Sequence, residues 1–111
     1  MEYKNKISLH IPHYAWDGRL KPINYKWFKC ELVATLSDIG IDSCFSVAAD
    51  GYYKGRGFEE EVLTVFCNNP GAVVKAMTDT FRQCNRVMHQ SAFTYELNGT
   101  LHIIPLTEEE K

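Results

Sequence analysis

The chain of 111 residues lacks the features that mark several large classes of protein. Its 12 Lys and Arg against 14 Asp and Glu leave a net charge of −2, which provides no net positive field to hold nucleic acid or an anionic membrane. No apolar run approaches the roughly 18 residues of a membrane span, and the N-terminus has no apolar stretch of the signal-peptide kind. We therefore expect a cytoplasmic protein without membrane or nucleic-acid partners.

Motifs for metals, cofactors and catalysis are also missing. The cysteines form no Cys-x-x-Cys pair, and each lies among apolar residues of a periodic segment, where a thiol behaves as a small hydrophobic group. No phosphate-binding loop, dinucleotide fingerprint, Ser-His-Asp or Cys-His arrangement is recognisable. We expect no cofactor, no metal and no catalytic residue, with reduced structural cysteines at Cys30, Cys44, Cys67 and Cys84.

Apolar residues are plentiful, at 45% of the chain, which is ample for one folded core. No linker or repeat divides the sequence. We expect a single domain over residues 1–106, followed by a frayed acidic tail at 107–111.

Hydrophobic periodicity predicts the secondary structure. Asn24 and Asn69 are suitable helix N-caps, and Asn98-Gly99 between two alternating runs indicates a β-hairpin. Segment 13–23 is interpreted as a long connection and 50–57 as a glycine-rich hairpin tip. The expected strands are 6–11, 43–49, 60–67, 93–97 and 101–103, and the expected helices are 25–39 and 72–88.

The order β-α-β-β-α-β with one extra C-terminal strand predicts an α+β fold, the ferredoxin-like two-layer sandwich with both helices on one face of the sheet. Apolar residues occur on both sides of several strands, as where Cys44 and Ala48 oppose Phe45 and Val47. A second apolar face needs a cover, most simply another copy of the chain. We therefore expect a homodimer or homotrimer.

Three short motifs resemble a small family of uncharacterised bacterial proteins. They are an Asp-Gly turn before a Trp-led helix at 17–28, a strand with a glycine hairpin at 49–52, and a Gln-led final strand at 90–93. The resemblance implies the same kind of fold and carries no chemistry.

Residues 43–61, with their Gly-Tyr-Tyr-Lys-Gly segment, resemble the second hairpin of the trimeric divalent-cation-tolerance and nitrogen-signalling PII-like proteins. Those families are ferredoxin-like. They bind small ligands or partner proteins through this hairpin and through clefts between subunits, so the resemblance implies a binding role.

Two loops carry the residue types of a binding site. The glycine-rich segment combines glycines that turn backbone amides outward with cations and aromatic rings that can stack on a ligand. This composition favours an anionic ligand at Tyr52, Tyr53, Lys54 and Arg56. An ordinary solvated hairpin tip has the same composition. The long aromatic loop before the first helix holds hot-spot residue types, although its Trp can also fold back over the core. Its candidate binding residues are His13, Tyr14, Trp16 and Arg19.

Carboxylates and histidines give weaker signals. Glu59-Glu60-Glu61 cannot converge on one site because successive strand residues point to opposite faces, so we interpret them as a charged end at a sheet edge. The four histidines are interpreted as isolated polar residues.

The sequence therefore favours a non-catalytic oligomeric protein that recognises a small anionic ligand or a protein partner. One alternative is a small enzyme of the dimeric α/β-barrel type, with His10, Tyr95 or His102 as acid or base in a sheet-face cavity. The other is an inhibitor or ligand-sequestering protein of the size that phage counter-defence proteins have.

Overall fold

The computed structural model describes residues 2–106 of the chain. The predicted acidic tail at 107–111 lies outside these residues. Within them the chain forms seven strands and two helices, in the order β1 (Asn5–Pro12), β2 (Tyr14–Trp16), β3 (Leu20–Pro22), α1 (Tyr25–Asp38), β4 (Phe45–Tyr53), β5 (Arg56–Cys67), α2 (Pro70–Met88), β6 (Ala92–Leu97) and β7 (Thr100–Pro105).

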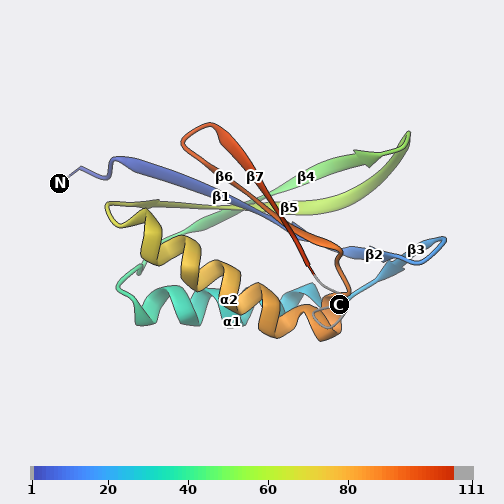
Figure 1. The fold of residues 1–111 in the computed structure, drawn as a ribbon, viewed down its shortest axis with the longest axis horizontal. Coiled ribbons are helices and arrows are strands. Elements are labelled where there is room, and N and C mark those ends of the chain that lie inside the picture. The colour runs from blue at the N-terminus through green and yellow to red at the C-terminus, as the bar shows by residue number, and fades with distance from the viewer. Residues whose placement is uncertain (1, 107–111) are drawn as a thin grey trace.

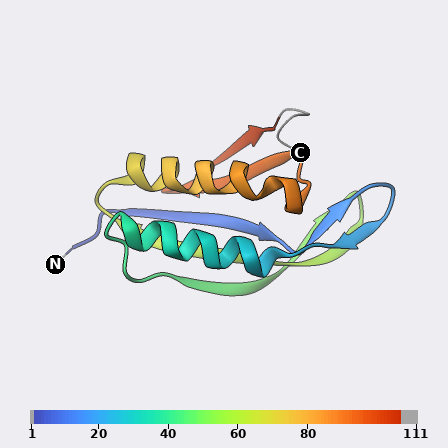
Figure 2. The ribbon, with the colours of Figure 1, turned by 90° about the horizontal axis from the view of Figure 1, so that it is seen from below.

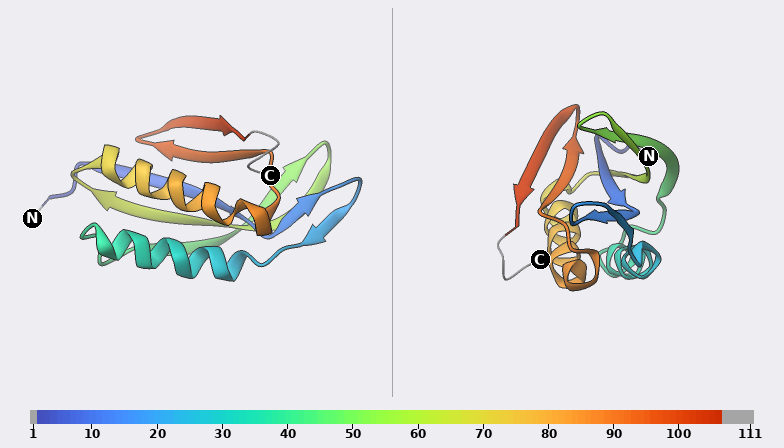
Figure 3. Two further views of the ribbon diagram at one scale, coloured as in Figure 1. Left: turned by 60° about the horizontal axis from the view of Figure 1, so that its bottom comes forward. Right: turned by 90° about the vertical axis from the view of Figure 1, so that its right-hand side faces the viewer.

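Five of the strands form one antiparallel sheet in the order β4-β5-β1-β6-β7. Both helices lie side by side along one side of this sheet (Figures 1 and 2). The other side faces away from the helices, as the end-on view in Figure 3 shows. The expectation of a mixed α+β domain with both helices on one face is confirmed at this level.

The core lies between the sheet and the helices. Alternation along β1 directs Ile7, Leu9 and Ile11 inward, where all three are fully buried. Phe28 of α1 and Phe81 of α2 belong to the same core, and their rings pack edge-to-face on each other with centroids 5.3 Å apart. This packing fixes the helices against the sheet and leaves the opposite sheet face available for a site.

The turns and caps follow local chemistry in most places. Asn98 and Gly99 both have positive φ, as the hairpin turn between β6 and β7 requires. Asn24 caps α1 by accepting a hydrogen bond from the Trp27 amide. The expected cap at Asn69 is wrong in one respect: its side chain makes no capping bond, although Pro70 occupies the first turn of α2.

The two predicted loops are more regular than expected. Segment 13–23 contains a two-stranded ribbon, in which Tyr14 pairs with Pro22 and Trp16 with Leu20. Most residues of the glycine-rich segment also belong to paired strands, because the pairing of β4 with β5 continues as far as Tyr53 and Arg56. Only Lys54 and Gly55 form the tip, and both have positive φ. Tyr52, Tyr53 and Arg56 therefore stand on paired strands, and Lys54 alone of the predicted binding residues in this segment lies in the tip.

The four cysteines are free, but they do not share one environment. Cys67 and Cys84 are buried, and burial raises the pKa of both thiols. Cys30 is exposed on α1, so the prediction that every cysteine packs as a hydrophobic group is wrong at this position.

The open side of the sheet is polar at its centre and apolar toward its margins. The Ser8 and Thr64 hydroxyls share a buried hydrogen bond of 3.1 Å. Around this pair lies the open-side patch, a set of exposed apolar side chains on β4, β5 and β7: Phe45, Val47, Phe66, Leu101 and Ile103. No helix within residues 2–106 is long and apolar enough to cross a membrane.

Candidate functional site

A cleft of about 1050 Å³ lies at one end of the open side of the sheet. The β4–β5 hairpin and the β2–β3 ribbon project together at this end of the molecule (Figure 1). The turn between α2 and β6 completes the wall. The lining residues are His10, Pro12, Tyr14, Trp16, Leu20, Tyr52, Tyr53, Lys54, Arg56, Phe58, Glu60, Phe81, His89, Gln90, Ser91, Ala92 and Thr94.

The cleft joins the two loops that the sequence singled out separately. Tyr52, Tyr53, Lys54 and Arg56 line it from the β4–β5 hairpin, and Tyr14 and Trp16 line it from the β2–β3 ribbon. A smaller hollow of about 420 Å³ adjoins it beside Tyr14, Tyr52 and Phe58.

Two of the predicted site residues, His13 and Arg19, are not among the lining residues. His13 turns instead toward α1, where its ring stacks on Tyr25. Arg19 lies in the β2–β3 turn, where its carbonyl oxygen accepts a hydrogen bond from the Asp17 amide. The local sequence gave no reason to separate these two residues from their neighbours.

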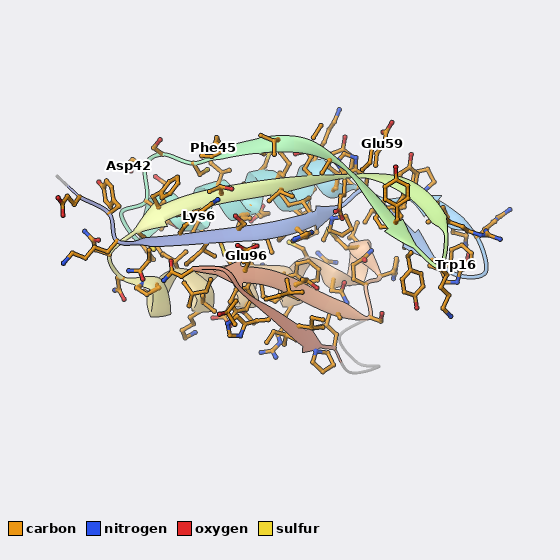
Figure 4. All side chains as sticks on the ribbon, turned by 90° about the horizontal axis from the view of Figure 1, so that it is seen from above. Lys6, Trp16, Asp42, Phe45, Glu59 and Glu96 are labelled. Carbon is orange, nitrogen blue, oxygen red and sulfur yellow. The ribbon has the colours of Figure 1, made fainter. Side chains whose placement is uncertain are left out.

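Cations of the cleft lie over its aromatic rings. The Arg56 guanidinium carbon is 5.0 Å from the Trp16 ring centroid, and this contact joins the β4–β5 hairpin to the β2–β3 ribbon. The Lys54 Nζ is 5.4 Å from the centre of the Tyr53 ring. Figure 4 looks onto the open side and shows Trp16 beside the tip of the β4–β5 hairpin. Both arrangements are cation–π contacts.

A carboxylate lies farther along the same strand. Glu60 Oε1 is 3.4 Å from His10 Nδ1, and the Glu60 side chain is 16% exposed. Arg56, Phe58 and Glu60 are alternate residues of β5 and therefore face the same side, about 7 Å apart at each step. The cleft thus carries a cationic and aromatic end and an acidic end.

Glu60 and His10 are the pair that the sequence-based interpretation missed. Glu59-Glu60-Glu61 was expected at a sheet edge, but β5 lies inside the sheet between β4 and β1. Glu60 therefore meets His10 of the neighbouring strand, and His10 is not the isolated polar residue that we expected. Alternation along β5 from Arg56 is the signal that could have placed Glu60 in the cleft.

Glu61 points to the other face and anchors the base of the cleft. Its carboxylate accepts hydrogen bonds from Lys29 Nζ at 2.7 Å and from His13 Nε2 at 3.1 Å. Burial raises the pKa of Glu61, but the hydrogen bond and charge of Lys29, with the His13 bond, outweigh burial and lower that pKa below its ordinary value. The ionised group ties β5 to α1 and to the β1–β2 junction.

Gln90 anchors the opposite wall. Its side-chain amide donates to the carbonyl oxygens of Tyr14 and Met88 at 3.0 and 2.9 Å. Its backbone amide donates to Asn85 Oδ1 at 2.8 Å, just beyond the left-handed C-cap at His89. These bonds fix the α2–β6 turn against β2, which holds the Tyr14 side of the cleft in place.

The other acid–base candidates of the enzyme alternative lie elsewhere. Tyr95 is buried, stacks on His102 with ring centroids 4.8 Å apart, and does not line the cleft. Of the three candidates, His10 is therefore the one in the cleft. Within residues 2–106 no group of three or more His, Cys, Asp or Glu side chains is placed to hold a metal ion.

Comparison with known proteins identifies the fold by structure. No protein-family model and no curated protein matches the chain. A solved phage SAM lyase in complex with S-methyl-5'-thioadenosine superposes with a TM-score of 0.63 at 12% identity, covering 92% of this chain and 89% of that chain. A phage SAM lyase in the apo state gives a TM-score of 0.62 at 14% identity, covering 94% and 90%.

These similarities cover nearly the whole length of this chain and of each solved structure, so they show a shared fold. They also correct the main functional expectation. The two solved structures described above are phage SAM lyases, which contradicts the interpretation as a non-catalytic binding protein and favours the alternative of a small enzyme.

Proposed function

We propose that the protein is a small lyase that cleaves S-adenosylmethionine and releases S-methyl-5'-thioadenosine in the cleft described above. The observation that carries the proposal is the cleft itself, which joins aromatic rings, cations and a carboxylate on a fold shared with SAM lyases. The candidate binding residues are Tyr14, Trp16, Tyr52, Tyr53, Lys54, Arg56, Phe58 and Glu60.

The product defines which bond breaks. S-methyl-5'-thioadenosine keeps the methyl and adenosyl groups, so the bond between sulfur and the amino-acid chain is cleaved. Sulfur retains the bonding electron pair and changes from a sulfonium cation to a neutral thioether. The substrate's own carboxylate oxygen supplies the electron pair to the carbon that sulfur leaves and closes a lactone, so no water or other co-reactant is consumed.

The cleft suits a reaction in which opposite charges disappear. A carboxylate and a sulfonium lose their charges together, so a wall of aromatic rings that replaces water weakens the solvation of the reactants more than that of the transition state. Holding the two reacting groups of one molecule close together supplies the remaining advantage. Neither effect needs a cofactor.

Glu60 is assigned to the ribose. A carboxylate that accepts hydrogen bonds from ribose hydroxyls is a common way to hold a nucleoside. Phe58 lies between Glu60 and Arg56 on the same face of β5, which leaves room for the ribose at the acidic end and the amino-acid chain at the cationic end. His10 positions the Glu60 carboxylate from β1.

The direct test is incubation of the purified protein with S-adenosylmethionine, followed by chromatography for S-methyl-5'-thioadenosine. We expect the thioether to accumulate with time and protein concentration. Glu60→Gln is expected to weaken binding of the substrate and of S-methyl-5'-thioadenosine by roughly tenfold each, because both contain the ribose. The matched control is Glu31→Gln, whose exposed side chain lies on α1 and lines neither the cleft nor the adjoining hollow.

A result without product contradicts the proposal. If the protein binds S-adenosylmethionine tightly but releases no thioether over hours, a ligand-sequestering role replaces the lyase role. If it neither binds nor cleaves the molecule, the cleft serves another ligand class.

We further propose that a second copy of the chain covers the open-side patch, as a homodimer or homotrimer. Phe45 and Phe66 stack there with ring centroids 6.4 Å apart, and Ile103 is 62% exposed. Light scattering should give a multiple of 12.8 kDa, and Ile103→Lys should shift it toward the monomer. A monomer at high concentration would refute this.

The same strand order supports a finer description of the fold. With β7 set aside, β4-β5-β1-β6 corresponds to the second, third, first and fourth strands of a βαββαβ unit, all antiparallel. This arrangement favours the ferredoxin-like sandwich, with β7 as the extra C-terminal strand.

A further inference from the structure

The Arg56–Trp16 contact places a cation where the proposed substrate has one. Trp16 is 51% exposed, yet one face of its ring carries the Arg56 guanidinium at 5.0 Å. Indole is the aromatic group that binds cations best. The ring is therefore a preformed cation site, which the protein's own arginine fills.

The proposed substrate carries one charge that can replace Arg56 on the Trp16 ring and another that can pair with Arg56. At the amino-acid end of S-adenosylmethionine a sulfonium and a carboxylate stand a few bonds apart. Arg56 and a sulfonium cannot share the Trp16 face without repulsion, whereas a guanidinium released from the ring can form two parallel hydrogen bonds with a carboxylate. Lys54, over the neighbouring Tyr53 ring, adds a second cation at this end.

The position of Arg56 in β5 also means that a short movement of its side chain is sufficient to leave the Trp16 ring. It is the first residue of β5, paired with Tyr53, and the two-residue tip directly precedes it. The ladder fixes its backbone, so the exchange needs a change of side-chain rotamer alone. The ribose position at Glu60, two alternate residues along the same face, remains occupied throughout.

We infer that Trp16 and Arg56 form a charge-exchange site: the substrate's sulfonium replaces Arg56 on the Trp16 ring, and Arg56 takes the substrate's carboxylate. This inference rests on the proposed function and names the residues that distinguish the sulfonium substrate from neutral thioethers.

Three ligands separate the two contacts by equilibrium binding. S-adenosylmethionine has both the sulfonium and the carboxylate, S-adenosylhomocysteine has the carboxylate alone, and S-methyl-5'-thioadenosine has neither. Trp16→Leu should weaken S-adenosylmethionine about tenfold and change the other two less than threefold. Arg56→Gln should weaken S-adenosylmethionine and S-adenosylhomocysteine about tenfold and leave S-methyl-5'-thioadenosine unchanged.

The protein provides a matched control. Arg86 lies over Trp27 at 5.6 Å, a second arginine–tryptophan contact whose members do not line the cleft. Trp27→Leu and Arg86→Gln should leave all three affinities unchanged. In a Trp27→Phe background Trp16 is the single tryptophan, because the chain has two. Its fluorescence should then respond to S-adenosylmethionine more strongly than to S-adenosylhomocysteine.

The outcomes separate this inference from the proposed function. If the wild-type protein cleaves S-adenosylmethionine but Trp16→Leu weakens all three ligands equally or none, the exchange is refuted while the lyase role stands. If the wild-type protein binds none of the three, both fail. Selective loss in the pattern above, with circular dichroism of each variant unchanged, supports the exchange.

Discussion

The two sides of the sheet differ in what their side chains do. On the helix side, Ile7, Leu9 and Ile11 are fully buried against Phe28 and its neighbours. On the open side, Phe45 of β4 and Ile103 of β7 are exposed, and Ser8, His10 and Glu60 form a polar row on β1 and β5.

This difference shows how one set of strands serves stability and chemistry at once. Because neighbouring residues point to opposite faces, β5 contributes Leu63 and Val65 to the core and Arg56, Phe58 and Glu60 to the cleft. Substitutions on the helix side should therefore act on folding, and those on the open side on ligand binding and association.

The largest expected effect is on the helix side. Phe28→Ala removes a fully buried ring and should lower the free energy of unfolding by about 3–5 kcal/mol. The matched change on the open side, Phe66→Ala, removes a ring that is 46% exposed and should cost less than about 1 kcal/mol. Urea denaturation at low protein concentration measures both. Equal costs would contradict the comparison.

A change beside the cleft should affect both stability and binding. At Gly51 an added Cβ would lie within 2.6 Å of Phe58 Cζ and 3.2 Å of Glu60 Cδ. Gly51→Ala should therefore cost about 1–3 kcal/mol of stability and weaken nucleoside binding. Gly71→Ala is the control, because nothing lies within 4 Å and the residue is helical. A neutral Gly51→Ala variant, by denaturation and calorimetry, would show that Phe58 yields easily.

The Glu61 anchor gives a pH-dependent prediction. Its lowered pKa means that the ionised carboxylate favours the folded state at pH values above the ordinary value of 4.5, and this contribution is lost as pH falls through the lowered pKa. Glu61→Gln should destabilise the protein by roughly 1–2 kcal/mol at pH 7 and progressively less in acid. Glu59→Gln is the control. A difference that grows below pH 4 would contradict the assigned network.

The smallest expected effect concerns the polar centre of the open side. Ser8→Ala leaves the buried Thr64 hydroxyl without its partner and should cost about 1 kcal/mol. Adding Thr64→Val removes the second hydroxyl and should recover most of that loss. Thermal unfolding of the two single variants and the double variant measures the coupling. Additive costs would mean that the two hydroxyls do not depend on each other.

Most of the fold could be predicted from local patterns. Alternation in β1 and β6, the three- and four-residue spacing from Phe28 to Leu36, and Asn98-Gly99 each depend on nearby residues. The β2–β3 ribbon could not be predicted, because strands of three residues are too short to show alternation. It is held instead by a distant contact, from Gln90 to the Tyr14 carbonyl.

The candidate site was predicted in parts. The residue types of the two loops indicated binding, and six of the eight residues do line one cleft. Their convergence and the Glu60–His10 pair depend on the register between β1 and β5, which joins residues far apart in the sequence. The expectation of a non-catalytic binding protein was wrong for a different reason. The residue types of the two loops indicate that a ligand binds, but they do not indicate whether the bound molecule reacts.

The β4–β5 hairpin is paired continuously up to Tyr53 and Arg56. Whether a side chain of the hairpin faces the cleft therefore depends on whether its residue is at an odd or an even position along the strand. A one-residue insertion in either strand would keep the hairpin but exchange its faces beyond that point. With the β1–β5 pairing kept from Leu63 onward, for example, an insertion just before Leu63 would turn Arg56 away from Trp16 and put Glu61 in the place of Glu60. Binding sites on loops commonly tolerate insertions. This site would not tolerate them, because its residues lie on paired strands, although it stands at the projecting end of the molecule.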